Sequence, residues 1–333
     1  MYTTRRQFAL LAALTLTTAA AASSVALAET PADNAAAAPV VIEAGASATY
    51  VNVMKGAMPK LPAFAALAPK RGFVRGYVKD VHGKPLAGAR LGVRSTVAGG
   101  FYSGAQGKTD AKGYYEIEVP WGAAHFYNAG YTVDYGEGRA ALGLHPADGE
   151  ADSFATANGS VENWVLLPYG IANRDDAQDK PYYINNYYGG GIHISYNLHD
   201  GSIFASPGDL PPNTRIELTL TPDGPLLDGS RGRTFVVRKP VSEDGINTLN
   251  VNNIPVGAYR IAARLLPSGG AAGTPLVLKE IGPNGGSAFG IEPKQATGTA
   301  TLLLRPTSAN AERAGAAHGN WDTIALKLER PAE

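Results

Sequence analysis

Short runs of alternating apolar and polar residues recur along the chain, and this pattern constrains its fold more than any other feature. Ile216, Leu218 and Leu220 alternate with polar residues, and residues 259–265 and 324–329 follow the same rule. A strand places successive side chains on opposite faces, so each run predicts a strand with one buried and one exposed face. We find no stretch of about a dozen residues with the spacing of three and four that an amphipathic helix needs.

Turn-forming residues separate these runs. The chain has 40 Gly and 23 Pro among 333 residues, and most of them fall between short β-branched or aromatic segments. This is typical of turn-rich all-β proteins. Because cores of this total size tend to split, the length favours two domains. The sequence therefore predicts an all-β protein with two antiparallel β-sandwich modules.

The predicted domains follow changes in composition. Residues 1–28 form an export signal, and residues 29–70 form an Ala- and Pro-rich linker with one short strand at residues 50–54. We expect the first β-sandwich in residues 71–180 and the second in residues 181–333.

The N-terminal segment is similar to a twin-arginine export signal. Arg5 and Arg6 are followed by a polar residue, Phe8 and a mildly apolar run, and Ala28 ends a small-x-small cleavage pattern. A protein with this signal crosses the membrane folded, is cut after Ala28, and resides in the periplasm or outside the cell. The alternatives are a general secretory signal and an uncleaved anchor, although the apolar run is shorter than the roughly 20 residues of a membrane span. We expect no transmembrane segment in the mature chain.

Charge and cysteine content narrow the function. The 29 basic and 29 acidic residues balance, so we expect no concentrated positive surface for nucleic acid. The lack of cysteine removes disulfides, thiolate nucleophiles and cysteine-ligated metals. None of the six histidines lies in a His-x-x-Glu or His-Glu-x-x-His pattern, so we expect neither a metal nor a cofactor.

The first module resembles the carboxypeptidase regulatory-like family over residues 72–120. The family pattern is a strand ending in Asp, a Gly-x-Pro turn, a Gly-Ala step and a Thr-Asp-x-x-Gly turn before an aromatic strand. The residues that carry it here are Asp80, Gly83, Pro85, Gly88, Ala89, Thr109, Asp110, Gly113 and Tyr114. The resemblance implies a small transthyretin-like or prealbumin-like β-sandwich that serves as a non-catalytic spacer or binding unit, and it transfers no activity.

In the second module, Pro255, Gly257 and Tyr259 are similar to a hairpin common to these and other immunoglobulin-like sandwiches. Pro255 and Gly257 turn the chain there, and Tyr259 re-enters the core. The resemblance thus implies the immunoglobulin-like or prealbumin-like class for both modules.

The segment between the modules is the candidate ligand site. Four tyrosines and two asparagines fall within seven positions, just before three glycines, and they are Tyr182, Tyr183, Asn185, Asn186, Tyr187 and Tyr188. A tyrosine offers an apolar face and a polar tip, which suits a sugar ring or a peptide. The alternative is a packed interface in which these tyrosines join the two sandwiches. Trp121 and Trp164 are interpreted as core residues, with a loop end as the alternative for Trp121.

These features favour an exported, non-catalytic binding or structural protein of the cell envelope. Its partner would be a carbohydrate, a peptide or an envelope protein, and its oligomeric state is left open. The alternative is a hydrolase acting on envelope polymers, with a site assembled from distant residues. Convergence of two or more of His125, His193, His199 and the nearby carboxylates in one pocket would favour that alternative.

Overall fold

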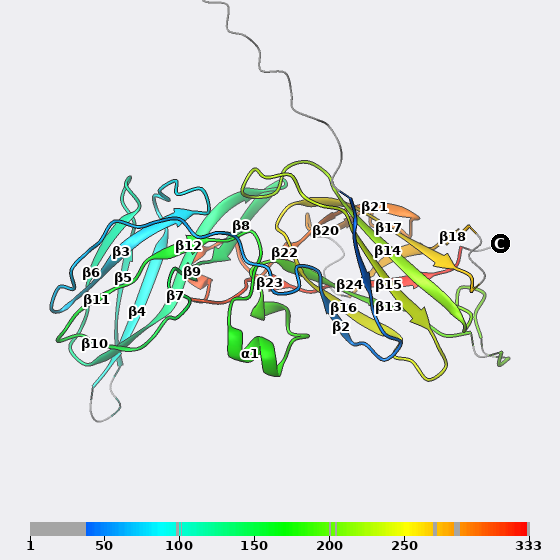
Figure 1. The fold of residues 1–333 in the computed structure, drawn as a ribbon, viewed down its shortest axis with the longest axis horizontal. Helices are drawn as coiled ribbons and strands as arrows, with labels where there is room; N and C mark the ends of the chain where they lie inside the picture. Colours follow the sequence, from blue (N-terminus) through cyan, green and yellow to red (C-terminus); the bar gives the residue numbers. More distant parts are fainter. Residues whose placement is uncertain are drawn as a thin grey trace, which may run out of the picture. The chain divides into compact units, whose positions relative to one another are not determined.

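The fold was analysed in a computed structural model, which describes residues 38–97, 100, 102–199, 201–203, 205–268, 272–282 and 287–331 (Figure 1). The predicted export signal, including Arg5, Arg6 and Ala28, lies outside the described residues.

The all-β prediction is confirmed, because nearly every described element is a strand. The first sandwich has one sheet ordered β10-β7-β4-β5 with β8 beside β7, and a second ordered β11-β3-β12-β9 with β6 beside β3. Its strands are β3 (Phe73–Asp80), β4 (Arg90–Thr96), β5 (Tyr102–Lys108), β6 (Tyr114–Glu118), β7 (Ala123–Tyr135), β8 (Gly138–Gly143), β9 (His145–Pro146), β10 (Phe154–Ala155), β11 (Ser160–Val161) and β12 (Trp164–Leu166).

The second sandwich pairs a sheet ordered β1-β15-β14-β17-β21-β20, with β18 beside β17, and a sheet ordered β19-β24-β13-β16-β2. Its strands are β1 (Val40–Glu43), β2 (Tyr50–Asn52), β13 (Gly190–Ser195), β14 (Thr214–Pro222), β15 (Phe235–Val241), β16 (Thr248–Ile254), β17 (Ala258–Leu266), β18 (Thr274–Pro275), β19 (Val277–Ile281), β20 (Gly290–Glu292), β21 (Thr299–Leu303) and β24 (Ile324–Glu329). The remaining elements are α1 (Arg174–Asp179), η1 (Ile184–Asn186), β22 (Arg305–Pro306), η2 (Ala311–Arg313) and β23 (Trp321–Asp322).

The sheets are mixed, whereas the sequence predicted antiparallel ones. In the first sandwich β11 and β12 run parallel to β3. In the second, β13 runs parallel to β24, and β1 and β2 run parallel to β15 and β16. Alternation along a strand reports which face is buried and carries no information about the direction of the neighbouring strand, which explains the difference.

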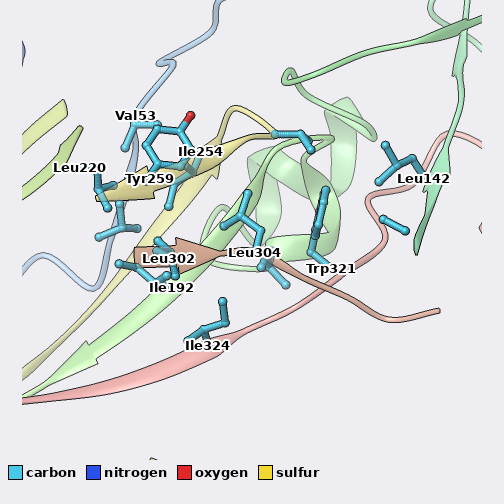
Figure 2. Close-up of a cluster of buried hydrophobic side chains, with 14 of the residues drawn as sticks. Val53, Leu142, Ile192, Leu220, Ile254, Tyr259, Leu302, Leu304, Trp321 and Ile324 are labelled. Carbon is cyan, nitrogen blue, oxygen red and sulfur yellow. The ribbon is translucent and has the colours of Figure 1, made fainter. Parts of the chain in front are cut away.

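The core of the second sandwich follows the alternation read from the sequence. Ile216, Leu218 and Leu220 of β14 are buried. Figure 2 shows side chains from β14, β17 and β21 in the same cluster as side chains from β13, β16 and β24. Tyr259 is fully buried, and its hydroxyl donates to the carbonyl of Pro255 at 2.7 Å, which closes the predicted turn.

The predicted linker contributes two strands to the second sandwich. β1 joins the edge of one sheet through β15, and β2 joins the edge of the other through β16. The turn between them is held by Lys239, whose Nζ donates to the carbonyls of Gly45, Ala46 and Ala48 at 3.3, 2.7 and 3.0 Å. Lys239 is fully buried, and burial lowers the pKa of its ammonium group. The second sandwich therefore uses chain from both sides of the first.

The C-terminal half also returns to the first sandwich. Asn128 of β7 is buried, and its Nδ2 donates to the carbonyls of Ala311 and Ala314 at 2.7 and 2.6 Å. The short helix η2 therefore packs against the first sandwich, although it lies within the range predicted for the second. The boundaries at residues 70 and 180 stay predictions.

Two turns of the first sandwich show what the aspartates of the family pattern, Asp80 and Asp110, do in the structure. Oδ1 of Asp80 accepts the backbone N–H groups of His82 and Lys84, both at 2.9 Å. Oδ1 of Asp110 accepts those of Lys112 and Tyr114 at 2.8 and 2.9 Å. Each aspartate therefore fixes the turn that follows it with its own side chain.

Candidate functional site

The tyrosine segment lies between α1 and β13 and divides into a buried and an exposed part. Tyr187 and Tyr188 are 2% and 3% exposed, whereas Tyr182 and Tyr183 are each 50% exposed. The short helix η1, which includes the buried Asn186, separates the two pairs.

Tyr188 is enclosed between the first sandwich and the C-terminal stretch. Its hydroxyl lies 3.2 Å from Nδ1 of His145, and the two rings meet edge to face. Its backbone carbonyl accepts a hydrogen bond from Nε1 of Trp321 at 2.8 Å. Burial raises the pKa of Tyr188 well above its usual value and lowers the pKa of His145 to about 4. At neutral pH both side chains are therefore uncharged.

Tyr187 and its neighbours are held by local hydrogen bonds. The hydroxyl of Tyr187 donates to the carbonyl of Pro181 at 2.7 Å, and burial raises its pKa to about 12. Nδ2 of Asn186 donates to the carbonyl of Lys180 at 3.0 Å. The backbone carbonyl of Asn185 accepts the N–H of Gly319 at 2.7 Å. The segment is therefore tied both to itself and to the C-terminal stretch.

This geometry leaves only two of the four tyrosines of the predicted ligand site, Tyr182 and Tyr183, accessible to a ligand. The rings of Tyr187 and Tyr188 are covered by protein, so they cannot contact a ligand at the surface. Their burial agrees with the alternative in which these tyrosines pack in an interface. Tyr182 and Tyr183 keep half-exposed side chains, and Nδ2 of the buried Asn252 holds their loop through the carbonyls of Pro181 and Tyr182 at 3.3 and 3.0 Å. Repeated tyrosines in the sequence do not reveal which of them will be covered.

Tyr135, at the end of β7, connects the two sandwiches and was not identified from the sequence. Its hydroxyl accepts the N–H of Leu304 at 2.9 Å and donates to the carbonyl of Gly257 at 3.0 Å. Its ring stacks on Phe289 and meets Trp321 edge to face. Burial raises its pKa above the usual value. A tyrosine that ends an alternating strand gives no sequence signal for such a contact.

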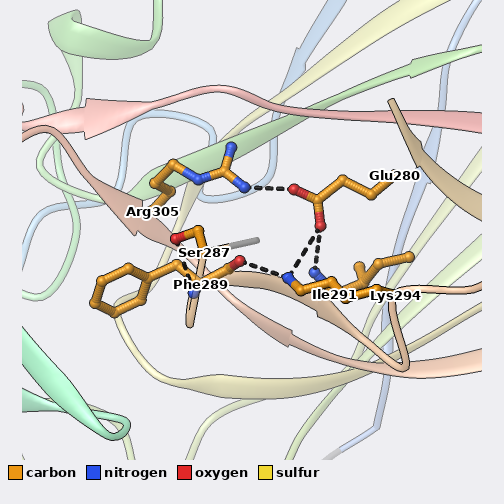
Figure 3. A network of polar contacts seen from close by, with 6 residues as sticks. All are labelled: Glu280, Ser287, Phe289, Ile291, Lys294 and Arg305. Atoms are coloured by element: carbon orange, nitrogen blue, oxygen red, sulfur yellow. Dashed lines mark hydrogen bonds and ion pairs between the residues drawn. The ribbon is translucent and has the colours of Figure 1, made fainter. Parts of the chain in front are cut away.

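A buried charge network stabilises the loops of the second sandwich (Figure 3). The carboxylate of Glu280 pairs with the guanidinium of Arg305 and lies 3.4 Å from Nζ of Lys294. It also accepts the N–H of Ile291 at 3.0 Å, while Nζ of Lys294 donates to the carbonyl of Phe289 at 2.8 Å. Both carboxylate oxygens are occupied, so we assign the network a structural role.

Trp121 is on the surface, which corrects the interpretation of this residue as part of the core. Its side chain is 73% exposed, whereas Trp164 is fully buried as predicted. The loop-end alternative fits Trp121, because Pro120 ends the strand region before it and β7 begins only at Ala123.

The histidines named for the hydrolase alternative are dispersed. His125 lies on β7 of the first sandwich and His193 on β13 of the second, where its Nδ1 is 3.0 Å from Oδ1 of Asn250. Among the described residues no group of three or more His, Cys, Asp or Glu side chains could hold a metal ion. His125 and His193 therefore do not meet in one pocket.

No helix in the described ranges has the length and apolar character needed to cross a membrane.

The sheets and their packing define this chain as an all-β protein with two β-sandwiches. No family profile matches the chain, and no curated protein matches it either. Solved structures that are similar to it are the TIE protein of Bacillus anthracis, a streptococcal ancillary pilin, and a C-terminal fragment of the pilus adhesin SpaC from Lactobacillus rhamnosus GG.

The similarity to these structures is distant. Identities are 13%, 12% and 11%, and TM-scores are 0.28, 0.22 and 0.26. The alignments cover 78%, 78% and 79% of this chain and 34%, 62% and 98% of the others. The chain thus spans about a third of the Bacillus protein and about three fifths of the ancillary pilin.

Proposed function

We propose that this chain is an exported protein of the cell envelope with a structural or adhesive role, which binds a carbohydrate, a peptide or an envelope protein through exposed aromatic side chains. The tyrosine segment is the observation that carries the proposal. Tyr187 and Tyr188 lie inside the molecule and tie its parts together, while Tyr182 and Tyr183 stay exposed on the same loop. The same segment thus holds parts of the molecule together and exposes two tyrosine side chains to a binding partner.

Export is part of the proposal and rests on the N-terminal sequence. Arg5 and Arg6 supply the twin-arginine pair, and Ala28 supplies the cleavage position. A chain without cysteine can complete its fold before crossing the membrane, because no disulfide has to form afterwards. The protein would then reside in the periplasm or outside the cell.

We also propose that the first sandwich is of the carboxypeptidase regulatory-like kind. The turns after Asp80 and Asp110 support this. The side chains of these two aspartates, which occupy the Asp positions of the family pattern, accept backbone N–H groups and so fix the turns. In this class the module is a spacer or binding unit, in line with the proposed role.

Cell fractionation and mass spectrometry of the full chain test the export proposal. We expect the mature protein to begin at Glu29 and to be found outside the cytoplasm. The double substitution Arg5→Lys with Arg6→Lys should leave the precursor in the cytoplasm, whereas Arg260→Lys with Arg264→Lys should be exported like the wild type. A wild-type chain that stays uncut in the cytoplasm contradicts export, and unchanged export of the Arg5→Lys, Arg6→Lys variant indicates the general secretory path.

A further inference from the structure

The side chain of Trp121 is exposed although burial would be favourable. It is 73% exposed, while the other two tryptophans, Trp164 and Trp321, are no more than 1% exposed. A buried aromatic side chain removes about 150–250 Å² from water, so an indole held at the surface forgoes a large stabilisation. Tryptophan is enriched among the residues that dominate binding interfaces, which makes this exposed indole a candidate contact residue.

The backbone beneath Trp121 is fixed by buried groups. Oγ of Ser95 donates to the carbonyl of Trp121 at 3.3 Å. The N–H of Gly122 donates to Oγ1 of Thr156 at 2.9 Å, and the N–H of Thr156 donates back to the carbonyl of Gly122 at 3.0 Å. Ser95 and Thr156 are both buried. The backbone that carries the indole is therefore held before any ligand arrives, which reduces the entropy lost on binding.

Gly122 is required for this arrangement. Its φ is +143°, a conformation that favours glycine, and a Cβ atom there would lie 2.4 Å from the carbonyl oxygen of Thr96. The close approach brings the chain after Trp121 down onto β4.

A groove of about 430 Å³ lies beside the indole. This is within the roughly 300–1,000 Å³ of small-molecule sites. The described residues of its lining are uncharged. Thr96, Ser153 and the indole N–H of Trp121 supply polar side-chain groups beside the apolar Val97 and Phe154 and several small residues. A charged ligand would find no partner in this lining.

We propose that this groove binds a neutral carbohydrate, with a sugar ring stacked on the indole of Trp121. A pyranose has an apolar C–H face that suits an aromatic ring and a rim of hydroxyl groups that suits Thr96, Ser153 and water. The absence of charge from the lining favours a neutral sugar over an acidic one or a charged peptide. The inference rests on the proposed binding function and names a site and a ligand class for it.

Tryptophan fluorescence gives a direct test, because iodide can reach Trp121 and not the two buried tryptophans. The mature protein is titrated with neutral cello-, chito-, malto-, laminari- and xylo-oligosaccharides of equal length. We expect at least one of them to protect Trp121 from iodide in a saturable manner. Calorimetric titration of that sugar should show an affinity about tenfold or more lower for Trp121→Ala.

Matched variants separate loss of this site from loss of any exposed apolar side chain and from unfolding. Ile203→Ala removes an exposed apolar side chain outside the groove lining and should keep the wild-type sugar affinity. Trp121→Ala should unfold at nearly the wild-type temperature, because the side chain is exposed.

Three results would overturn the proposal. These are no protection by any of the five sugars, the full wild-type sugar affinity in Trp121→Ala, and protection by polygalacturonate or a proline-rich peptide in place of the neutral sugars. None of them affects the export result, so failure of this inference is distinguishable from failure of the proposed function.

Discussion

At the scale of single residues, the first sandwich contains two titratable groups whose pKa values are shifted in opposite senses. Glu162 is buried, and burial together with the charges of Asp148 and Asp152 raises its pKa to about 8. His145 is also buried, which lowers its pKa to about 4. Both shifts favour the uncharged form in the folded state.

The two groups act on stability in different pH ranges. Folded Glu162 holds its proton more tightly than the unfolded chain does, so its contribution is complete below the ordinary pKa of 4.5 and is lost as the pH rises through about 8. Folded His145 holds its proton less tightly, so its contribution is complete above 6.5 and is lost as the pH falls towards 4. Between pH 6.5 and 8, therefore, the dependence comes from Glu162 rather than His145.

We predict that Glu162→Gln removes this dependence. The free energy of unfolding of the wild type should fall by about 1–2 kcal/mol between pH 6.5 and 8, and that of the variant should stay nearly constant. Urea denaturation at several pH values measures the difference. Glu118→Gln, at an exposed position of β6, should keep the wild-type slope. Equal slopes for wild type and Glu162→Gln would contradict the prediction.

At the scale of secondary-structure elements, β3 shows how backbone packing determines one residue. A Cβ atom at Gly76 would lie 1.8 Å from the carbonyl oxygen of Glu162, which accepts the hydroxyl of Tyr115 at 2.7 Å. That hydroxyl in turn accepts Nε1 of Trp164 at 3.2 Å. The chain between β11 and β12, which both run parallel to β3, thus approaches β3 so closely at Gly76 that only glycine fits.

We predict that Gly76→Ala destabilises the protein by about 2–4 kcal/mol, because the chain near Glu162 must move and its bond to Tyr115 weakens. Gly104→Ala on β5 is the matched control, since a Cβ atom there meets only an ordinary contact at 3.5 Å. Thermal and urea denaturation compare the two variants. Similar stabilities of the two variants would show that the chain near Glu162 can move away from β3 without loss of stability.

The strands that the sequence predicted are those with clear alternation or a marked turn. β14, β17 and β24 lie within a few residues of their predicted positions. β5 was missed because it has few apolar side chains and lies at a sheet edge, and β1 because it is short and surrounded by Ala and Pro. An edge strand buries little side-chain surface, so its sequence carries a weak pattern.

At the scale of the whole molecule, the two sandwiches share chain and side chains. From Val40 onwards, the polypeptide runs through β1 and β2 of the second sandwich, forms the first, and returns to the second at β13. Tyr135 inserts from the first sandwich and occupies backbone groups of Gly257 and Leu304 in the second. We infer that the stability of one sandwich depends on the other.

We predict that Tyr135→Phe lowers the free energy of unfolding by about 1–3 kcal/mol, because two buried backbone groups lose their partner. Hydrogen exchange should rise most at the amide of Leu304, which loses its acceptor. Tyr131→Phe is the control on the same strand, since the Tyr131 hydroxyl makes no hydrogen bond to a described residue. Unchanged exchange at Leu304 in Tyr135→Phe would argue against this coupling.

The sequence by itself determined the all-β class, most of the strands, the turns at Asp80 and Asp110, and the inward position of Tyr259. These depend on interactions within a few residues, which alternation and turn chemistry record directly. The tertiary structure alone decided that the predicted linker completes the second sandwich, that Tyr187 and Tyr188 are covered, and that Trp121 is exposed. A local pattern shows that a side chain suits burial, but whether it is buried depends on a partner distant in sequence that must supply the covering surface.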